Sequence, residues 1–443
     1  MKNNSTENNL IVGLDIGTTK IVTVVGYRNQ NGLIDIVGWG RADSTGVEFG
    51  EIINIFQTVD GIRMSKQNAT NQVHCDLDNL PVFVGVAGHH IKTSTYRHYL
   101  YRYGIEDPIQ QEEIEKLKRD VEKVSLNPGE KLIDVIPQSY VIDNGRETPD
   151  PVGVLGHTVM GTYQLIKGEE AEINKILRCG KDAELMFKEI ILEPMASAIS
   201  CLTEEEKQRG VALIDIGGGT TDLIIYNNGS PVFTKVIAIG GNIITSDISK
   251  ICSISRDTAE KLKIQHGTCI VSKSNQNNII TIPRQPSPIQ ISEHYLAQII
   301  NARVEDDIIA TVKREIDNSG YAAMVGNCGI VITGGGAQLK HLKELIQFKT
   351  GYNTRIGIPE NGFEKNIPSD LKKSAYATAL GLLKYGIETV NGPSSSFSDE
   401  EDLYTSDEEA RKKRREPNGD PTKRWGVFKK VWDYFKERME QVS

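Results

Sequence analysis

The stretch Gly13-Leu14-Asp15-Ile16-Gly17-Thr18-Thr19-Lys20 decides the fold, because a matching copy follows about half the chain later. That copy is Leu213-Ile214-Asp215-Ile216-Gly217-Gly218-Gly219-Thr220-Thr221-Asp222. In both copies an apolar strand ends in Asp, a Gly/Thr turn follows, and a second strand leads to an Asn-Gly turn, at Asn31-Gly32 and at Asn228-Gly229. A third strand completes each unit. The duplication predicts two similar domains that face each other.

The two Gly-rich turns have the chemistry of phosphate loops, because Gly lets backbone N–H groups approach phosphate oxygens closely. Each loop joins two strands, whereas a Walker loop or a dinucleotide fold needs a strand-loop-helix order. A plain hairpin turn would explain one copy, but not two copies and a third cluster, Thr333-Gly334-Gly335-Gly336. We therefore predict one nucleotide between the domains, with phosphates bound at Gly17, Thr18, Thr19, Lys20, Gly217, Gly218, Gly219, Thr220 and Thr221.

The two Asp residues at the strand ends indicate a metal ion. Asp15 and Asp215 would face the same phosphates from opposite domains. Carboxylates beside a polyphosphate repel it unless a hard cation lies between them. Mg²⁺ that keeps several of its waters is the cation that fits this setting best. The sequence therefore predicts a magnesium site at Asp15 and Asp215, bound largely through water.

The composition fits an acidic chain of several domains. Its 443 residues carry a formal net charge of -8, which argues against nucleic acid as the main partner. The six cysteines include no Cys-x-x-Cys pair, which is typical of reduced thiols. The N-terminus is polar, and no apolar run approaches the roughly 18 residues of a membrane span. We expect a cytoplasmic chain that does not span a membrane.

The sequence pattern changes several times along the chain. Helical spacing predicts helices over residues 50–65, 107–124 and 292–319. Beyond residue 386 the composition loses its apolar residues, and acidic and then basic clusters predict a disordered linker. An apolar periodic pattern returns over residues 424–442.

Five motifs in this order resemble the actin/Hsp70/sugar-kinase superfamily. They are the two phosphate loops, the adenosine motif 333–336, and two connecting helices that start at Glu193 and at Ser374. Together the motifs span nearly all of residues 10–386. Within the superfamily the chain resembles the FtsA family of bacterial cell-division proteins, on residues 84–91, residues 135–140 and the C-terminal helix.

The resemblance implies an α/β fold: an actin-like (ribonuclease H-like) duplicated two-domain fold with a nucleotide cleft between the halves. It also implies a division of the chain into named parts. These are subdomain 1A (10–83 and 163–209), inserted subdomain 1C (84–162), subdomain 2A (210–239 and 329–386), subdomain 2B (240–328), the linker (387–423) and an amphipathic membrane-targeting helix (424–443).

The resemblance also assigns roles at the nucleotide. ATP and Mg²⁺ are the implied ligands. Glu193 lies where the superfamily positions the attacking water, although a Glu at a helix N-terminus also complements the helix dipole. Glu260 and Lys263 match positions that contact ribose and adenine, the alternative being surface charge on an amphipathic helix. Lys20 departs from the actin position of the phosphate lysine. Further nucleotide contacts are implied at Gly240, Gly334, Gly335 and Gly336.

The C-terminal segment has one apolar face when wound at about 100° per residue. Its members are Trp425, Phe428, Val431, Trp432, Phe435, Met439 and Val442. Aromatic residues beside lysines are typical of a helix that lies in the interface of an anionic bilayer. The alternative is a helix that docks on its own domain or on a partner.

The resemblance implies a structural and adaptor role rather than a fast enzyme, with at most weak ATPase activity. It implies protofilaments on the cytoplasmic face of the inner membrane at the division site, as a peripheral protein that recruits later division proteins. The C-terminal peptide of FtsZ would dock on residues 240–328. Arg303 and Glu305 are the local candidates, although an exposed helical Arg is ordinary.

Two other functions of the superfamily remain as alternatives, a carbohydrate kinase and a rod-shape or pilus-assembly protein. A carbohydrate kinase would need a catalytic Asp in a substrate domain, and residues 84–162 contain no recognisable kinase motif. A chaperone ATPase is not expected, because no β-rich substrate domain follows the second half. Rod-shape and pilus-assembly relatives lack this combination of insert and C-terminal helix.

Overall fold

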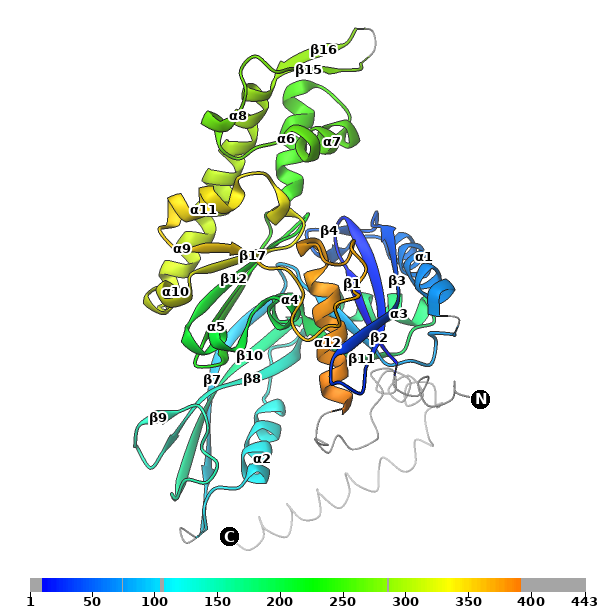
Figure 1. The fold of residues 1–443 in the computed structure, drawn as a ribbon. Coiled ribbons are helices and arrows are strands. Elements are labelled where there is room, and N and C mark those ends of the chain that lie inside the picture. The colour runs from blue at the N-terminus through cyan, green and yellow to red at the C-terminus, as the bar shows by residue number, and fades with distance from the viewer. Residues whose placement is uncertain (1–9, 74, 104–106, 285–286, 392–443) are drawn as a thin grey trace, which may run out of the picture. The chain divides into compact units, whose positions relative to one another are not determined.

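The structure, a computed structural model, describes residues 10–73, 75–103, 107–284 and 287–391 (Figure 1). The predicted linker from residue 392 onward and the predicted helix 424–443 lie outside the described residues. None of the helices in the described part combines the length and apolarity that crossing a bilayer requires.

The first half of the fold is built on a five-stranded sheet in the order β11-β6-β1-β2-β3. β1 pairs antiparallel with β2 and parallel with β6, and β6 pairs parallel with β11. Asp15 lies opposite Val22 in the β1–β2 register. The strands are β1 (Ile11–Ile16), β2 (Lys20–Arg28), β3 (Ile34–Asp43), β6 (Val82–Val86) and β11 (Phe187–Leu192).

The second half repeats this topology in the order β14-β13-β12-β17-β18. β12 pairs antiparallel with β13 and parallel with β17, and Asp215 lies opposite Asp222. The strands are β12 (Val211–Ile216), β13 (Thr221–Asn227), β14 (Ser230–Ile237), β17 (Ile330–Thr333) and β18 (Thr354–Ile356). The predicted duplication and the actin-like α/β fold class are therefore confirmed.

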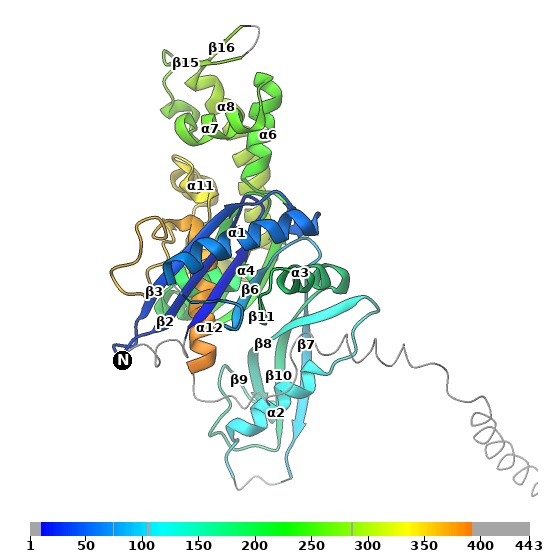
Figure 2. The same ribbon diagram turned by 90° about the vertical axis from the view of Figure 1, so that its right-hand side faces the viewer.

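Helices cover these sheets, so β1 and β12 are buried along their whole length. Helix α1 (Ile55–Val73) lies in front of the first sheet in Figure 2. It packs so closely that a Cβ on Gly40 would meet the backbone of Ser65 and Ala69. The predicted helix 50–65 is present as α1, but it begins later and ends later than predicted. It begins later because residues 47–52 form a short hairpin of β4 (Val47–Glu48) and β5 (Glu51–Ile52).

Two helices occupy the positions of the predicted connecting helices. They are α4 (Glu193–Cys201) and α12 (Ala377–Asn391). A Cβ on Gly381 of α12 would fall on the Ala196 carbonyl of α4, so the helices cross at backbone contact. Ile387 is fully buried, and α12 continues through residues 387–391, so the predicted linker 387–423 is wrong at its start.

The segment after β6 forms a separate four-stranded sheet in the order β7-β10-β8-β9. Its own core joins Leu117 and Val121 of the helix to Val159 and Tyr163 of the central strand. The elements are β7 (Lys92–Tyr101), α2 (Gln111–Glu122), β8 (Glu130–Ile142), β9 (Glu147–Thr148) and β10 (Thr158–Glu169).

The segment between β14 and β17 is mainly helical and shares a core with the second sheet. The predicted helix 292–319 is present as α8 (Glu293–Arg303), a π-helical turn (Val304–Ile309) and α9 (Ala310–Asn318). The other elements of this segment are α6 (Gly241–Cys252), α7 (Arg256–His266), β15 (Ile279–Ile282), β16 (Ile289–Ser292) and α10 (Ala322–Cys328). Elsewhere lie α3 (Glu170–Asp182), α5 (Glu204–Arg209) and α11 (Leu342–Thr350).

Candidate nucleotide site

The two predicted phosphate loops adopt the same turn and touch each other. The Gly17 N–H donates to the Lys20 carbonyl at 3.0 Å, and the Gly217 N–H donates to the Thr220 carbonyl at 2.9 Å. A Cβ on Gly219 would lie 2.6 Å from Thr18 Oγ1, and a Cβ on Gly218 would collide with the methyl group of Thr19. Glycine is therefore required where the second loop meets the first.

The start of α6 supports the second loop from behind. Two backbone N–H groups, those of Gly241 and Asn242, donate to the carbonyls of Gly217 and Gly218 at 2.9 and 2.8 Å. A Cβ on Gly240 would lie only 2.6 Å from the Gly218 carbonyl oxygen. Gly240, for which the sequence implies a nucleotide contact, thus packs against the second phosphate loop.

Asp15 and Asp215 lie near the ends of β1 and β12, the central strands of the two sheets, and both are buried. Burial raises the pKa of Asp15 to about 6; the nearby Lys20 opposes this rise and Asp215 adds to it. Burial also raises the pKa of Asp215. Glu193, the first residue of α4, adds to the same cluster: burial, and then three neighbouring Asp carboxyl groups, raise its pKa well above the ordinary value.

The third neighbouring carboxyl group belongs to Asp222, to which the sequence motifs assign no role. It is 3 % exposed on β13, and burial followed by the charge of Asp215 raises its pKa well above the ordinary value. Thr220 donates to its Oδ2 at 3.3 Å, while its buried Oδ1 has no partner among the described residues. The register could have identified this residue, because Asp222 takes the place that apolar Val22 has in the first copy.

Asp215 is oriented by hydroxyl groups from both connecting helices. Ser197 of α4 donates to Asp215 Oδ2 at 2.5 Å, and Thr378 of α12 donates to the same oxygen at 3.2 Å. Each donation favours the charged form of the carboxyl group and partly offsets its burial. The aspartate is thus held in one position by helices that belong to different parts of the chain.

Lys20 is the cation of this cluster that acts on both strand-end carboxyl groups. Its charge lowers the pKa of Asp15 and of Asp215 against the larger effect of burial. Its Nζ lies 5.6 Å from the centre of the Tyr376 ring, within the range of a cation–π contact. Lys20 is therefore close enough to both carboxyl groups for its charge to favour their ionised forms.

The donor set fits a hydrated magnesium ion better than a directly ligated one. No group of three or more His, Cys, Asp or Glu side chains in the described ranges is arranged to hold a metal by itself. Four buried or partly buried carboxyl groups, one of them with an unpartnered oxygen, are nevertheless grouped around the phosphate loops. Such groups suit a cation that keeps its inner waters and receives hydrogen bonds through them.

The third glycine cluster packs against the second strand-end aspartate. Gly334 has φ +84°, and a Cβ there would collide with Asp215 Oδ1. Gly336 lies against Ile216, whereas a Cβ on Gly335 would meet no atom within 4 Å. The predicted adenosine motif therefore adjoins the phosphate cluster, and its middle residue borders open space.

Lys263 of α7 points at the start of α6. Its Nζ donates to the Gly241 carbonyl at 3.0 Å and to Thr245 Oγ1 at 2.8 Å, and it pairs with Glu260 at 2.7 Å. The Lys263 side chain is only 12 % exposed, whereas that of Glu260 is 40 % exposed. Lys263 thus lies behind the second phosphate loop, residues 217–221, rather than on an open helix face.

Arg303 and Glu305, the predicted partner-binding residues, both have partners within the chain. Arg303 pairs with Asp247 of α6 and donates to Asp307 at 2.7 Å. Glu305 pairs with Lys349 of α11. Both residues lie at the junction of α8 and the π-helical turn, and the Arg303 side chain remains 37 % exposed.

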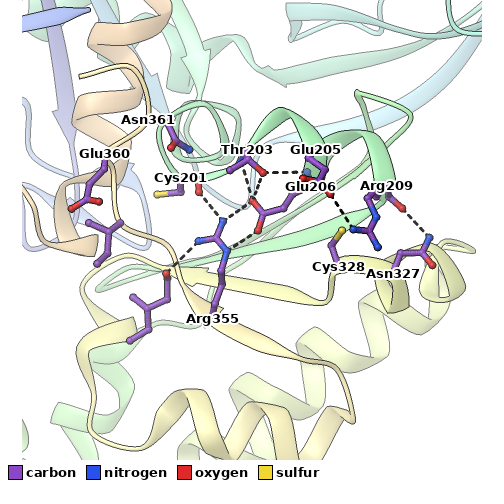
Figure 3. A pocket seen from close by; sticks show the side chains of 12 residues that line it. Cys201, Thr203, Glu205, Glu206, Arg209, Asn327, Cys328, Arg355, Glu360 and Asn361 are labelled. Atoms are coloured by element: carbon purple, nitrogen blue, oxygen red, sulfur yellow. Dashed lines mark hydrogen bonds and ion pairs between the residues drawn. The ribbon is translucent and has the colours of Figure 1, made fainter. Parts of the chain in front are cut away.

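A cavity of about 570 Å³ lies between α5, α10 and the end of β18, and none of the phosphate-loop residues lines it. Figure 3 shows Arg355 pointing toward Glu206 across this cavity. Its Nε and Nη2 donate to the two Glu206 oxygens at 2.7 and 2.6 Å, and Nη2 also donates to the Cys201 carbonyl at 3.0 Å. This bidentate pair fastens the end of α4 and α5 to β18.

Solved structures of low sequence identity share the fold. The PilM-PilN type IV pilus biogenesis complex matches with TM-score 0.61 and 15% identity, covering 85% of this chain and 98% of that chain. MreB5 of Spiroplasma citri bound to ADP matches with TM-score 0.52 and 17% identity, covering 87% and 100%. These likenesses show an actin-like fold.

Sequence comparisons identify the family. The model described as "Cell division protein FtsA" matches residues 212–381, and the model of the "SHS2 domain inserted in FTSA" matches residues 88–167. The chain is 32% identical to the cell division protein FtsA of Pseudomonas aeruginosa, over 90% of this chain and 94% of that one. It is 33% identical to FtsA of Borreliella burgdorferi, over 85% and 91%. The chain therefore belongs to the FtsA family of cell-division proteins.

Proposed function

We propose that this division protein binds ATP with Mg²⁺ between its two halves, assembles into filaments, and links FtsZ to the membrane through its C-terminal segment. The observation that carries the nucleotide part is the meeting of two identical phosphate turns beside a cluster of four carboxyl groups. A hydrated cation would offset the charge of these groups and of the phosphates together.

Different residues around the carboxyl cluster would bind different parts of the nucleotide. The backbone of residues 17–20 and 217–221 would hold the phosphates, and Asp15, Asp215 and Asp222 would hold water of the cation. Gly334, Gly335 and Gly336 would leave room for the adenosine. Glu193 would accept a proton from a water at the terminal phosphate, in line with at most weak ATPase activity.

Nucleotide binding is tested by titration with fluorescent ATP in the presence of Mg²⁺. Lys263→Gln should weaken binding by about tenfold, because it removes a charged donor that holds the Gly241 carbonyl behind the second phosphate loop. Lys261→Gln is the matched control, since Lys261 lies exposed on the same helix. Equal affinity of the two variants would contradict the assignment of Lys263.

We propose that the FtsZ C-terminal peptide docks on the helical segment around Arg303 and Glu305. The Arg303 side chain is 37 % exposed beside a π-helical turn, an irregularity that is frequent at functional sites. An acidic peptide would compete with Asp247 and Asp307 for the guanidinium group. Arg303→Glu should weaken binding of the peptide, as a titration would measure. Arg314→Glu on α9 changes the charge equally and is the control, which should keep the native affinity.

The membrane part of the proposal rests on the sequence of residues 424–443, with the aromatic face defined above. Deletion of residues 425–443 should abolish co-sedimentation with vesicles that contain anionic lipid. A chain that still co-sediments after this deletion would contradict the proposal. Electron microscopy on a lipid monolayer with and without ATP tests the filaments, which should be bound to the lipid.

A further inference from the structure

The hairpin of residues 47–52 has a strained turn. Its two turn residues, Phe49 and Gly50, have φ values of 49° and 79°. A bulky aromatic residue at positive φ is an outlier, and such backbone persists where surrounding contacts hold it in place. Phe49 is 52% exposed, so burial of this residue does not account for the conformation.

The tip of the 47–52 hairpin touches both phosphate loops. The Gly50 N–H donates to Thr18 Oγ1 of the first loop at 3.1 Å. A Cβ on Gly219 of the second loop would lie 2.8 Å from the Cα of Phe49. Because the Thr18 hydroxyl accepts from Gly50, its own hydrogen remains to be donated to a phosphate oxygen.

The second strand of the hairpin contacts the residues that lead into the inserted sheet, just before β7. Glu51 Oε1 lies 3.0 Å from His90 Nδ1 and 2.8 Å from His89 Nδ1, just before β7 begins. An ionised carboxylate only accepts, so each Nδ1 carries the hydrogen. The His90 side chain is 2 % exposed, and a Cβ on Gly168 of β10 would lie 3.4 Å from its ring. His90 is therefore packed between the hairpin and the insert.

The orientation of the His90 ring depends on its hydrogen bond with Glu51. The His90 Nε2 is buried and has no hydrogen-bond partner among the residues that the structure describes. Within those residues, Glu51 is thus the group that fixes the orientation of the ring. A shift of the hairpin would therefore change the polar contact that, within the described part of the chain, holds this ring.

We propose that the 47–52 hairpin transmits occupancy of the phosphate loops to the inserted sheet of residues 92–169, through Glu51 and His90. The inference rests on the proposed nucleotide binding. A ligand shifts a conformational equilibrium only through contacts that differ between the states. Here the contact that would differ is the hydrogen bond from the Gly50 N–H to the Thr18 hydroxyl, which strengthens when that hydroxyl also donates to a phosphate.

Hydrogen exchange of the full chain with and without Mg-ATP tests the transmission, beside a direct titration of ATP binding. In the native chain, amides of residues 88–101 and 130–142 should exchange more slowly with Mg-ATP, by about fivefold, a low value for coupling between sites. Glu51→Ala should bind ATP as the native chain does and lose this change. Glu48→Ala, on the exposed side of the same hairpin, should keep it.

His90→Phe is the second variant, because it preserves the buried ring volume and removes the Nδ1 donor. It should reproduce the loss seen with Glu51→Ala, even if the alanine variant folds poorly. ATP binding without any change of exchange in the native insert would overturn the transmission and leave the proposed function standing. A native chain that binds no ATP would instead overturn both. A folded His90→Phe variant that shows the native change of hydrogen exchange with Mg-ATP would also contradict the proposed transmission.

Discussion

At the scale of single residues, the carboxyl cluster accounts for most of the unusual electrostatics. Asp15, Asp215, Asp222 and Glu193 are grouped in the fold although they come from four separate elements. Like charges in a buried site oppose each other's ionisation. The cluster therefore destabilises the empty protein at neutral pH, and a bound cation would relieve this cost.

The raised pKa of Asp15 predicts that the protein loses stability as the pH rises. Its pKa of about 6 exceeds the ordinary value of 3.8, a difference that corresponds to about 3 kcal/mol. The folded state binds the proton more tightly, so this contribution is fully present below about pH 4 and is lost as the pH rises to about 6. In nucleotide-free protein with chelator, Asp15→Asn should therefore lose less stability over this range, as urea titrations at successive pH values would measure.

Glu113→Gln is the control of opposite sign. The hydrogen bond from Arg102 lowers the pKa of Glu113, so that this pair stabilises the fold above the ordinary pKa and loses its effect as the pH falls. The Glu113→Gln curve should approach that of the native chain toward acid pH. Parallel curves for Asp15→Asn and the native chain between pH 4 and 7 would contradict the first prediction.

At the scale of elements, the crossing of α4 and α12 positions much of the site. α4 carries Glu193 and Ser197, and α12 carries Thr378, while Gly381 sets the distance between the two helices. The crossing depends on the missing side chain at Gly381, because any Cβ would occupy the place of the Ala196 carbonyl.

Gly381→Ala should therefore destabilise the fold by about 1–3 kcal/mol, the usual cost of forcing extra volume into a packed core. It should also weaken ATP binding, because it moves Ser197 and Thr378 relative to Asp215. Thermal and urea unfolding measure the first effect. Gly326→Ala on α10 is the control: its Cβ would meet no atom within 4 Å, and it should stabilise the chain by up to about 1 kcal/mol. Equal stability of both variants would contradict the crossing argument.

At the scale of the whole described molecule, two sheets of the same topology contribute to one site. The two aspartates of β1 and β12, the two loops and the third glycine cluster meet only when both halves are folded. A ligand at this place binds the folded state and not the unfolded one. Its effect on stability therefore reports on the assembled site.

Mg-ATP at about a hundred times its Kd should raise the free energy of unfolding by about 2.7 kcal/mol. In EDTA the increase should be smaller, because the phosphates then face the carboxyl cluster without a cation. Gly335→Gln should fold as the native chain does, since the space beside Gly335 is open, yet lose the increase. The same increase with and without Mg²⁺ would argue against a cation in the site.

Much of the fold could be predicted from short-range patterns. Asn228-Gly229 forms the expected two-residue hairpin turn, with φ values of 51° and 79°, because Asn and Gly tolerate this conformation. The duplicated strands follow from apolar runs that end in Asp. The helix predicted at 50–65 was misplaced at its start, because nothing local distinguishes a short hairpin at residues 47–52 from a first helical turn.

The sequence by itself determined the duplicated strand-loop-strand units, the strand-end aspartates and the membership in the FtsA family. These depend on residue order, which local backbone preferences translate directly into turns and strands. Only the tertiary structure decided that Lys263 supports the second phosphate loop, and that the 47–52 hairpin bridges the loops to His90. Those relations join residues far apart in the chain, and they arise from the packing of whole elements, which no local pattern encodes.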